Sequence, residues 1–178
     1  MRSRTPSTGP ADAGFAGRLS EPLTAVVAGA RRRAVRDGDK HLDTAHLLHT
    51  LLESDPRVRA AFAGGPPQVV RLLGYLVQRT IGYGLRWSGT VEDSGAVPVV
   101  GRAEEAAAGW SPAAVAAMEA AIRRAAARGA LRADGPDLLA ALLRDRQCRA
   151  VEVLRRAGVD GDLLVMALNG EVCQQSTG

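Results

Sequence analysis

Residues 42–52 (LDTAHLLHTLL) decide how this chain folds, because they combine a helix start with a buried helix face. Asp43 or Thr44 can cap the helix, since a side-chain oxygen at that place accepts a backbone N–H that has no partner inside the helix. Four leucines then recur at helical spacing and predict one apolar face: Leu47, Leu48, Leu51 and Leu52. The stretch therefore predicts a helix that packs against a core.

Another helix is expected directly before this stretch. Ser20 is a good N-cap, and Pro22 lies in the first turn, where a helix loses no hydrogen bond to proline. Gly38 is typical of the left-handed residue that ends a helix. Between these signals an apolar residue recurs every three or four positions and predicts one buried face: Leu23, Val26, Val27, Ala30 and Ala34.

Two further helices are expected after the leucine-rich one. The pair Asp55–Pro56 predicts the start of a short helix, which ends before residues 64–66 (GGP). The next helix is expected to carry a row of apolar residues: Val69, Val70, Leu72, Leu73, Leu76 and Val77. The amino-terminal part of the chain therefore predicts four helices.

The same scheme recurs 91 residues later, which indicates an internal duplication. Without a gap, residues 19–52 align with residues 110–143, and 12 of the 34 positions are identical. In the second copy we expect Asp145 to cap a third helix, and Asp160 to open a fourth that Gly170 ends. The cap, glycine and leucine positions of the first copy recur in order: Ser111, Gly129, Asp134, Leu138, Leu139, Leu142 and Leu143.

The duplication predicts two tandem four-helix repeats related by a pseudo-two-fold axis. The first repeat is expected over residues 19–81 and the second over 110–170. Residues 82–109 between them predict an irregular segment or a hairpin, because glycines and a proline interrupt any helical pattern. Residues 1–18 and 171–178 are expected to be disordered tails.

Composition excludes disorder of the whole chain, because 46% of the 178 residues are hydrophobic and 24% are charged. Alanine and leucine dominate and only 3% of residues are aromatic, which favours an all-α fold over sheets. No apolar run approaches the about 18 residues of a membrane span, and no secretory signal is visible. Cys148 and Cys173 are too few for a disulfide framework or a zinc site, so we expect a cytoplasmic protein.

The formal net charge is +4, and Lys40 is the single lysine among 23 basic residues. This balance leaves a basic helical nucleic-acid-binding regulator as the alternative function, with arginine faces at residues 31–33 and 123–124. Acidic residues are interspersed with the arginines, however, and no aromatic residue interleaves with these clusters. The leading expectation for the arginines is therefore a solvated surface.

The motif in residues 42–48, with the repeat around it, resembles the amino-terminal repeat domain of Clp-family AAA+ unfoldases, the Clp N or Clp R domain. That family carries an Ile-Gly-Thr-Glu-His-Leu-Leu signature in each copy, and an aromatic residue followed by threonine at each first-helix start. Leu19–Ser20 and Trp110–Ser111 occupy the latter positions here, and residues 133–139 match the signature less well. The resemblance covers about residues 19–170.

The resemblance implies a non-enzymatic domain that binds proteins or peptides. In the full unfoldases this domain docks adaptors and substrates, but the ATPase phosphate loop cannot be built here, because Lys40 has no preceding glycine. We therefore expect a free-standing Clp N protein without cofactors, which acts as adaptor, decoy or modulator of Clp-dependent proteolysis. Its expected partners are a Clp unfoldase, an adaptor or a degron-bearing client, and not a membrane. The expected contact residues are Leu19, Ser20, Glu21, Trp110, Ser111 and Asp137.

Some relatives in this family bind phosphorylated arginine through the signature glutamate and the threonine at the first-helix start. The hydroxyls persist here as Ser20 and Ser111, but the glutamate positions are occupied by Ala45 and Pro136. Loss of a charged partner weakens such a contact. We therefore do not expect phospho-arginine binding, unless a nearby acid such as Glu21 or Asp137 substitutes.

Metal and catalytic sites find little support in the sequence. His46 and His49 lie about one turn apart, but a zinc site needs a third ligand. His46 also matches the histidine of the family signature, which we expect to be structural. Ser20 and Ser111 are assigned as helix caps, and no nucleophile motif occurs. We therefore predict no metal ligands and no catalytic residues.

Overall fold

The computed structural model describes residues 14–80 and 109–175. Within these two ranges the chain is all-α, as predicted, with eight helices and no strand. Most of the expected insert, 82–109, lies outside the described residues, as do both chain ends. The helices are α2 (Glu21–Asp37), α3 (Thr44–Ser54), α4 (Pro56–Ala60), α5 (Gly65–Thr80), α8 (Pro112–Ala127), α9 (Gly135–Leu142), α10 (Arg149–Arg156) and α11 (Gly161–Gln175).

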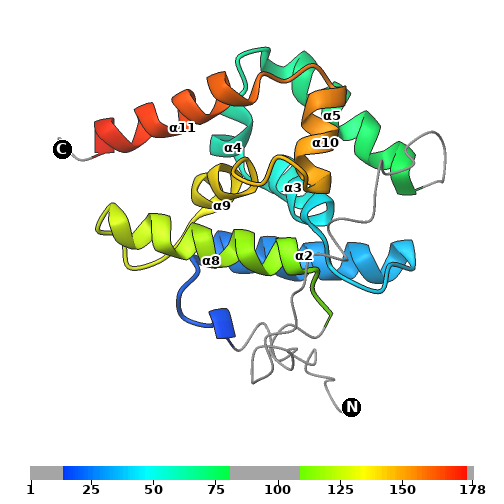
Figure 1. Ribbon diagram of the computed structural model, residues 1–178, viewed down its shortest axis with the longest axis horizontal. Coiled ribbons are helices and arrows are strands. Elements are labelled where there is room, and N and C mark those ends of the chain that lie inside the picture. Colours follow the sequence, from blue (N-terminus) through cyan, green and yellow to red (C-terminus); the bar gives the residue numbers. More distant parts are fainter. Residues whose placement is uncertain (1–13, 81–108, 176–178) are drawn as a thin grey trace, which may run out of the picture.

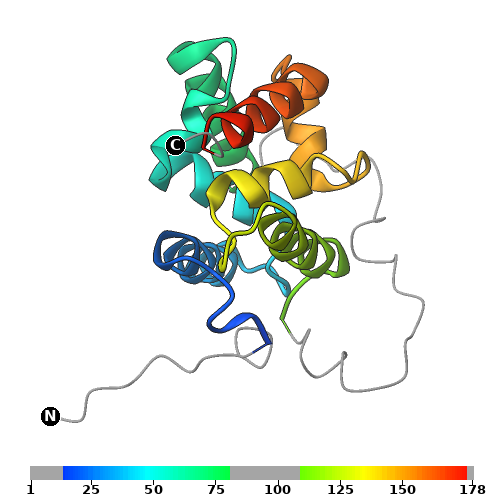
Figure 2. The same ribbon diagram turned by 90° about the vertical axis from the view of Figure 1, so that its left-hand side faces the viewer.

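The helices form layers around α3. Figures 1 and 2 show α2 and α8 side by side, α3 and α9 above them, and the remaining four helices beyond. The four leucines of α3 are completely buried, as their spacing predicts, and so are three of their four counterparts in and after α9. The described helices also include none with the length and apolar composition needed to cross a bilayer.

Side-chain caps start the four helices whose beginnings the sequence marked most clearly. Ser20 and Ser111 accept hydrogen bonds from Leu23 N (3.3 Å) and Ala114 N (3.2 Å). Asp43, rather than Thr44, caps α3. The caps of α3 and α9 are reciprocal, because the residue three positions on also accepts a hydrogen bond from the cap backbone: His46 after Asp43, and Asp137 after Asp134.

Backbone hydrogen bonds tie the start of each first helix to the loop before the other half's second helix. The two pairs of contacts are related by the 91-residue offset, with the halves exchanged. They run from Ser20 N to Ala133 O (2.8 Å) and Ala133 N to Arg18 O (2.9 Å), and from Ser111 N to Leu42 O (2.8 Å) and Leu42 N to Gly109 O (2.8 Å). These contacts support the duplication, while a two-fold relation of the complete halves stays a prediction.

Ion pairs join the halves at the same two loops. The N-cap Asp43 receives a hydrogen bond from Arg149 Nη1 of α10 (2.9 Å), and the N-cap Asp134 receives one from Arg57 Nη1 of α4 (3.0 Å). Each cap therefore also anchors a helix of the other half. Because the partners lie 106 and 77 residues apart, no local sequence signal announces them.

Two predicted helix boundaries are wrong. Asp145 does not cap α10, which begins at Arg149; its carboxylate instead accepts a hydrogen bond from Gln147 N (3.0 Å) in the preceding turn. Gly170 does not end α11, which continues to Gln175. A glycine weakens an exposed helix by only about 1 kcal/mol, so it need not stop one.

Some apolar residues lie elsewhere than expected. Val70 and Val77, from the apolar row expected in α5, are exposed rather than buried, and Leu163 of α11 is exposed as well. At the other extreme, Phe15 is buried and packs edge-on against Trp110, with ring centroids 5.5 Å apart. The fold therefore includes residues at the end of the expected 1–18 tail.

Gly135 is expected to tolerate no side chain, whereas Gly74 should accept one. A Cβ at residue 135 would overlap Asp55 Oδ2 and lie 3.0 Å from its Cγ, and Asp55 is fixed as the N-cap of α4. We expect Gly135→Ala to lower the free energy of unfolding by about 2 kcal/mol. At Gly74, no described atom lies within 4 Å of a Cβ, so Gly74→Ala should raise it by about 0.5–1 kcal/mol.

Urea denaturation of the two glycine variants and the wild type measures both changes. The matched pair separates packing from helix propensity, because alanine favours the helix at either position. Equal stabilisation by Gly135→Ala and Gly74→Ala would contradict the close approach of Asp55.

Candidate functional site

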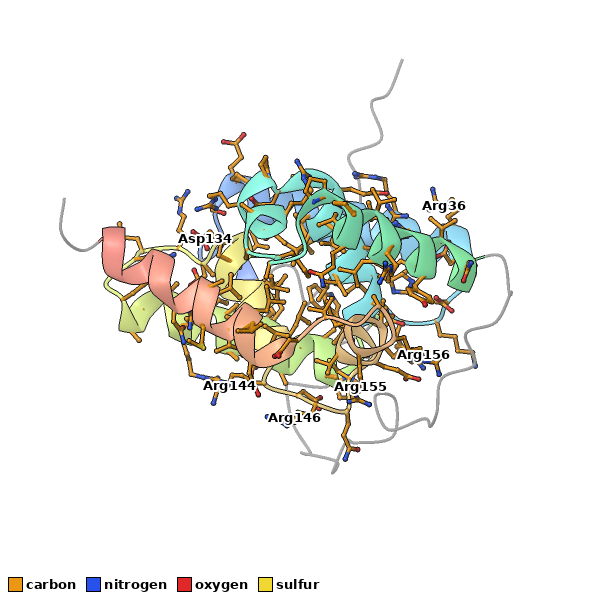
Figure 3. All side chains as sticks on the ribbon, turned by 90° about the horizontal axis from the view of Figure 1, so that it is seen from above. Arg36, Asp134, Arg144, Arg146, Arg155 and Arg156 are labelled. Carbon is orange, nitrogen blue, oxygen red and sulfur yellow. The ribbon has the colours of Figure 1, made fainter. Side chains whose placement is uncertain are left out.

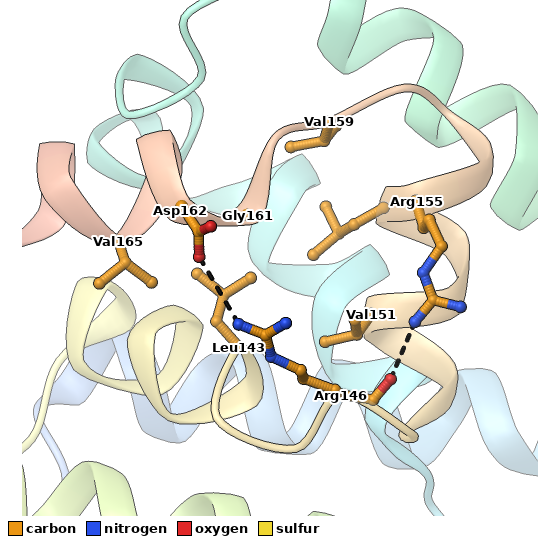
Figure 4. A pocket seen from close by; sticks show the side chains of 9 residues that line it. Leu143, Arg146, Val151, Arg155, Val159, Gly161, Asp162 and Val165 are labelled. Atoms are coloured by element: carbon orange, nitrogen blue, oxygen red, sulfur yellow. Dashed lines mark hydrogen bonds and ion pairs between the residues drawn. The ribbon is translucent and has the colours of Figure 1, made fainter.

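A pocket opens between the end of α9, α10 and the start of α11 (Figure 4). Its volume is about 200 Å³. Five apolar residues form its floor, and all but Leu154 are only half-buried. Two arginines and an aspartate stand at the rim. The nine lining residues are Leu143, Arg146, Val151, Leu154, Arg155, Val159, Gly161, Asp162 and Val165.

Two short turns give the pocket its shape. Before α10, the buried Cys148 lies with Sγ 3.6 Å from Leu142 O, which it reaches as a weak hydrogen-bond donor. After α10, Gly158 adopts a left-handed conformation (φ 74°), so the chain reverses toward α11. Asp160 then caps α11 by accepting from Leu163 N (3.1 Å). The turns thus bring α10 and α11 together as the walls of one pocket.

The rim carries two arginines, and the ion pair that one of them forms is weak. Arg146 Nη2 lies 3.8 Å from Asp162 Oδ1, and the two side chains are 83% and 90% exposed, so their pairing in water is weak. Arg155 Nη2 donates to Arg146 O (3.0 Å), which directs its guanidinium across the wall of α10 (Figure 4). An apolar side chain could therefore enter the floor while a carboxylate pairs with the arginines.

A second pocket, of about 230 Å³, lies between α8 and the loop after α9. Four alanines of α8 contribute most of one wall, and Cys148 and Thr44 lie at its other side. Thr44 Oγ1 already accepts a hydrogen bond from Ala150 N (3.1 Å). Arg123, Arg144 and Asp145 complete the lining, so the second pocket combines a wall of small apolar side chains with charged residues.

The residues predicted to contact a partner do not line either pocket. Most of them are buried: Trp110, Ser111 and Asp137 almost completely, and Leu19 nearly so. Ser20 is half-buried, and Glu21 is exposed on the first turn of α2. Asp137 is tied by two hydrogen bonds from Arg128 (3.1 and 2.7 Å). A partner role for these six residues stays a prediction.

The residues at the positions that bind phospho-arginine in some Clp N domains are here buried, half-buried or hydrogen-bonded within the fold. Ala45 is buried and Pro136 is half-buried. Ser20 and Ser111 use their hydroxyls as caps. Of the two acids named as substitutes, Asp137 already pairs with Arg128, and Glu21 is exposed on α2.

The arginine clusters of α2 and α8 are partly occupied by acids and amides of their own half. Arg33 pairs with Glu53 of α3. Arg124 donates to Asn169 Oδ1 (2.9 Å). Such pairing reduces the positive charge available to nucleic acid.

The sequence contained one usable sign of the pocket. The helix α11 is apolar around most of its circumference, which is typical of a helix buried on all sides. The structure instead leaves Leu163 and Met166 52% and 68% exposed. These exposed apolar side chains lie next to the pocket, so the apolar character of α11 was a sign of this site, although no sequence motif predicted it.

No family model and no curated protein matches the sequence. Solved structures do match it. One, titled "Preliminary structural investigations of a malarial protein secretion system", aligns with a TM-score of 0.59 and 14% identity over 88% of this chain and 95% of that chain. Another, the N-terminal domain of the caseinolytic protease associated chaperone ClpD from Arabidopsis thaliana, aligns with a TM-score of 0.58 and 18% identity over 87% of this chain and 94% of that chain. The chain therefore has an all-α, Clp N-like fold, as the resemblance in its sequence predicted.

Proposed function

We propose that this chain is a non-enzymatic protein-binding module that captures peptides carrying an apolar residue beside acidic ones. The observation that carries the proposal is the pocket between α9, α10 and α11, whose apolar floor stays open under Arg146 and Arg155. Apolar surface that remains exposed under a polar rim is typical of interaction sites.

The apolar surface continues beyond the pocket along α11. Leu163 and Met166 are exposed on this helix, and Val165 lines the pocket itself. An unbranched thioether such as Met166 adapts to different partner side chains. A peptide of several residues could therefore follow α11 with one side chain in the pocket.

The preference for acidic neighbours follows from the charges around the pocket. Figure 3 shows Arg144, Arg146, Arg155 and Arg156 along the same edge of the molecule. Guanidinium groups pair with carboxylates through two parallel hydrogen bonds, and the weak pairing of Arg146 with Asp162 can be exchanged for such a contact. Acidic segments are therefore favoured over basic ones.

The likeness to a Clp chaperone domain supports a place in Clp-dependent proteolysis. In this proposal the chain acts in the cytoplasm as adaptor, decoy or modulator of a Clp ATPase or protease, and its pocket holds an unfoldase, an adaptor or a degron-bearing client. A pull-down with a Clp ATPase ring and its peptidase tests this role. Failure to recover either component under any nucleotide condition would count against it, while leaving peptide binding intact.

Reversal of the rim charge should weaken peptide binding. We expect Arg146→Glu to reduce the affinity for a fluorescent Asp-Leu-Phe-Glu peptide at least about tenfold, because one favourable charge pair becomes a repulsive one. Val165→Asp, which places a charge in the floor, should have a similar effect. Fluorescence anisotropy at moderate ionic strength measures both affinities.

Arg32→Glu is the matched control, because Arg32 is exposed on α2, in the layer of helices away from α11, and the variant has the same net charge as Arg146→Glu. It should bind as the wild type does. Equal affinity in all variants would refute the pocket as the binding site. Tight, salt-sensitive binding of DNA or RNA in a gel shift would instead favour the nucleic-acid alternative.

A further inference from the structure

Two carboxylates and an imidazole converge where α2 turns into α3. Asp37 is the last residue of α2, Asp39 follows Gly38, and His46 lies in the first turn of α3. His46 Nε2 is 2.9 Å from Asp39 Oδ2 and 3.7 Å from Asp37 Oδ2. One ligand atom from each residue lies within 4.8 Å of the other two. The three groups thus surround one point.

The turn between the helices produces this convergence. Gly38 adopts a left-handed conformation (φ 73°) and donates its N–H to Ala34 O and Val35 O, which closes the end of α2. Asp39 N also donates to Ala34 O (3.0 Å). The residues on both sides of Gly38 are therefore held beside the start of α3.

The imidazole of His46 is fixed and points into the cluster. Its side chain is completely buried, and Nδ1 lies 3.0 Å from Asp43 N and 2.9 Å from Asp43 Oδ1. Among the described residues, Nε2 finds no hydrogen-bond partner, since Asp39 Oδ2 is at the right distance but not in hydrogen-bond geometry. A buried polar atom without a partner is rare in folded proteins and points to an ion or water.

We propose that Asp37, Asp39 and His46 bind a divalent first-row transition metal ion of the Zn²⁺ type. Ligand atoms about 2.1 Å from a tetrahedral zinc stand about 3.4 Å from one another. His46 Nε2 lies 2.9 and 3.7 Å from the two carboxylate oxygens, on either side of that value, and those oxygens lie within 4.8 Å of each other. Rotation of the aspartate side chains would bring all three ligand atoms around one ion. The partly exposed Asp39 leaves a route for the ion and for a water ligand.

The chemistry of the donor set selects the metal. Imidazole nitrogen combined with carboxylate oxygen suits Zn²⁺ and its neighbours, whereas Ca²⁺ and Mg²⁺ prefer oxygen ligands alone. Asp43 N donates to Nδ1 (3.0 Å), so a neutral ring carries its proton on Nε2. A metal bound at Nε2 would displace this proton to Nδ1, which would give up the hydrogen bond from Asp43 N and donate to Asp43 Oδ1 (2.9 Å) in its place. Arg149 holds the other oxygen of Asp43 (2.9 Å) and so fixes this outer contact.

Electrostatics also favour a cation here. The carboxyl end of α2 carries the negative end of its helix dipole, and Asp37 and Asp39 add two negative charges to it. Arg36 lies 3.7 Å from Asp37 Oδ1 and is largely exposed, so water weakens its interaction with the carboxylate. The helix end and the two carboxylates therefore favour a cation at this point.

The second half of the molecule gives an internal comparison. With the 91-residue offset, Asp37 corresponds to Arg128 and His46 to Asp137. There the guanidinium of Arg128 supplies the positive charge directly, 2.7 Å from Asp137 Oδ2. In the first half an acid replaces that arginine and an imidazole replaces that acid, and Asp39 adds a second carboxylate where the second half has Ala130.

Isothermal titration of untagged protein with Zn²⁺ tests the site. We expect one saturable site in the wild type, and at least tenfold weaker binding by Asp39→Asn. Asp39 is exposed enough for this variant to fold, whereas His46→Gln also removes part of the α3 cap. Co²⁺ should give the visible absorption of a four-coordinate site, and Asp39→Asn should abolish it.

Two control variants keep the test specific. Asp162→Asn removes an exposed carboxylate far from the cluster, and His41→Gln removes the exposed histidine nearest to it in sequence. Both should bind Zn²⁺ as the wild type does. Absence of saturable binding, or equal binding by Asp39→Asn, would overturn the proposal. So would nuclear magnetic resonance spectra showing no change in the ring nitrogens of His46 between metal-free protein and saturating Zn²⁺.

Discussion

Replacement of Arg128 by methionine is expected to lower the free energy of unfolding by about 3 kcal/mol. Arg128 donates two parallel hydrogen bonds to Asp137, whose side chain is only 2% exposed. Asp137 keeps its contact with Asp134 N (3.1 Å) and a longer one with Arg124 (3.5 Å), but it loses its principal counter-charge. A buried carboxylate without that partner destabilises the fold. The expected loss lies at the lower end of what removing one partner of a buried ion pair costs, because Arg128 itself is 20% exposed.

Urea denaturation measures this change, and Arg123→Met is the matched control. Arg123 lies on the same helix, α8, but is mostly exposed and 3.9 Å from Glu119, so its loss should alter stability by less than about 0.5 kcal/mol. The double variant Arg128→Met/Asp137→Asn should recover part of the loss, because it removes the buried charge. Equal stabilities of Arg128→Met and Arg123→Met would contradict this account.

The pairing with Asp137 also keeps Arg128 charged under all relevant conditions. The hydrogen bond to Asp137 raises the pKa of Arg128, and this effect exceeds the opposing effect of burial. The Coulombic attraction of Asp137 and Asp134 acts in the same direction. The effect of Arg128→Met should therefore stay constant between neutral and mildly alkaline pH.

Local features of the fold could be predicted from the sequence because their causes are local. Ser20, Asp43 and Asp134 each cap a helix whose N–H groups lie two or three residues further along the chain. Gly38 ends α2 because its own conformation does so. The leucine pairs are buried because their spacing places them on one face of a helix.

Contacts between distant segments could not be predicted in this way. The pairing of Arg149 with Asp43 depends on where α10 begins, and the sequence placed that start at Asp145. An aspartate caps a single turn as readily as a helix, and the choice depends on how the buried Cys148 packs. Because the predicted start of α10 was one turn too early, the contact of Arg149 with Asp43 could not be predicted.

The candidate sites were missed for related reasons. Trp110 and Ser111 have residue types that suit a partner surface, yet the contacts between the halves bury them. Val151 and Leu163 are residue types typical of a core, yet α10 and α11 leave their surroundings open. The cluster of Asp37, Asp39 and His46 needed the exact turn at Gly38 as well as the residue types.

Acidification should destabilise this protein through His49. Burial, and then the charge of Arg33, lower the pKa of His49 from 6.5 to about 4, against the opposing influence of Glu53 and Asp37. Above pH 6.5 the ring is neutral in the folded and unfolded chain, so it has no effect on stability. Between pH 6.5 and about 4 the unfolded chain binds a proton that the folded chain refuses. The free energy of unfolding should therefore fall by about 3 kcal/mol over this interval because of His49 alone.

A comparison with His49→Gln isolates this contribution, because glutamine does not titrate and can still reach Glu53, whose Oε1 lies 3.2 Å from His49 Nε2. Urea denaturation at intervals from pH 7.5 to pH 4 should show the wild type losing about 3 kcal/mol more than His49→Gln. The control His41→Gln removes an exposed histidine and should follow the wild-type curve. Carboxylates away from His49 contribute equally to all three curves, so the differences between the curves report on His49 and its interaction with Glu53 and Asp37. Parallel curves for the wild type and His49→Gln would mean that the folded protein accepts the proton, and that α3 opens around His49 when it does.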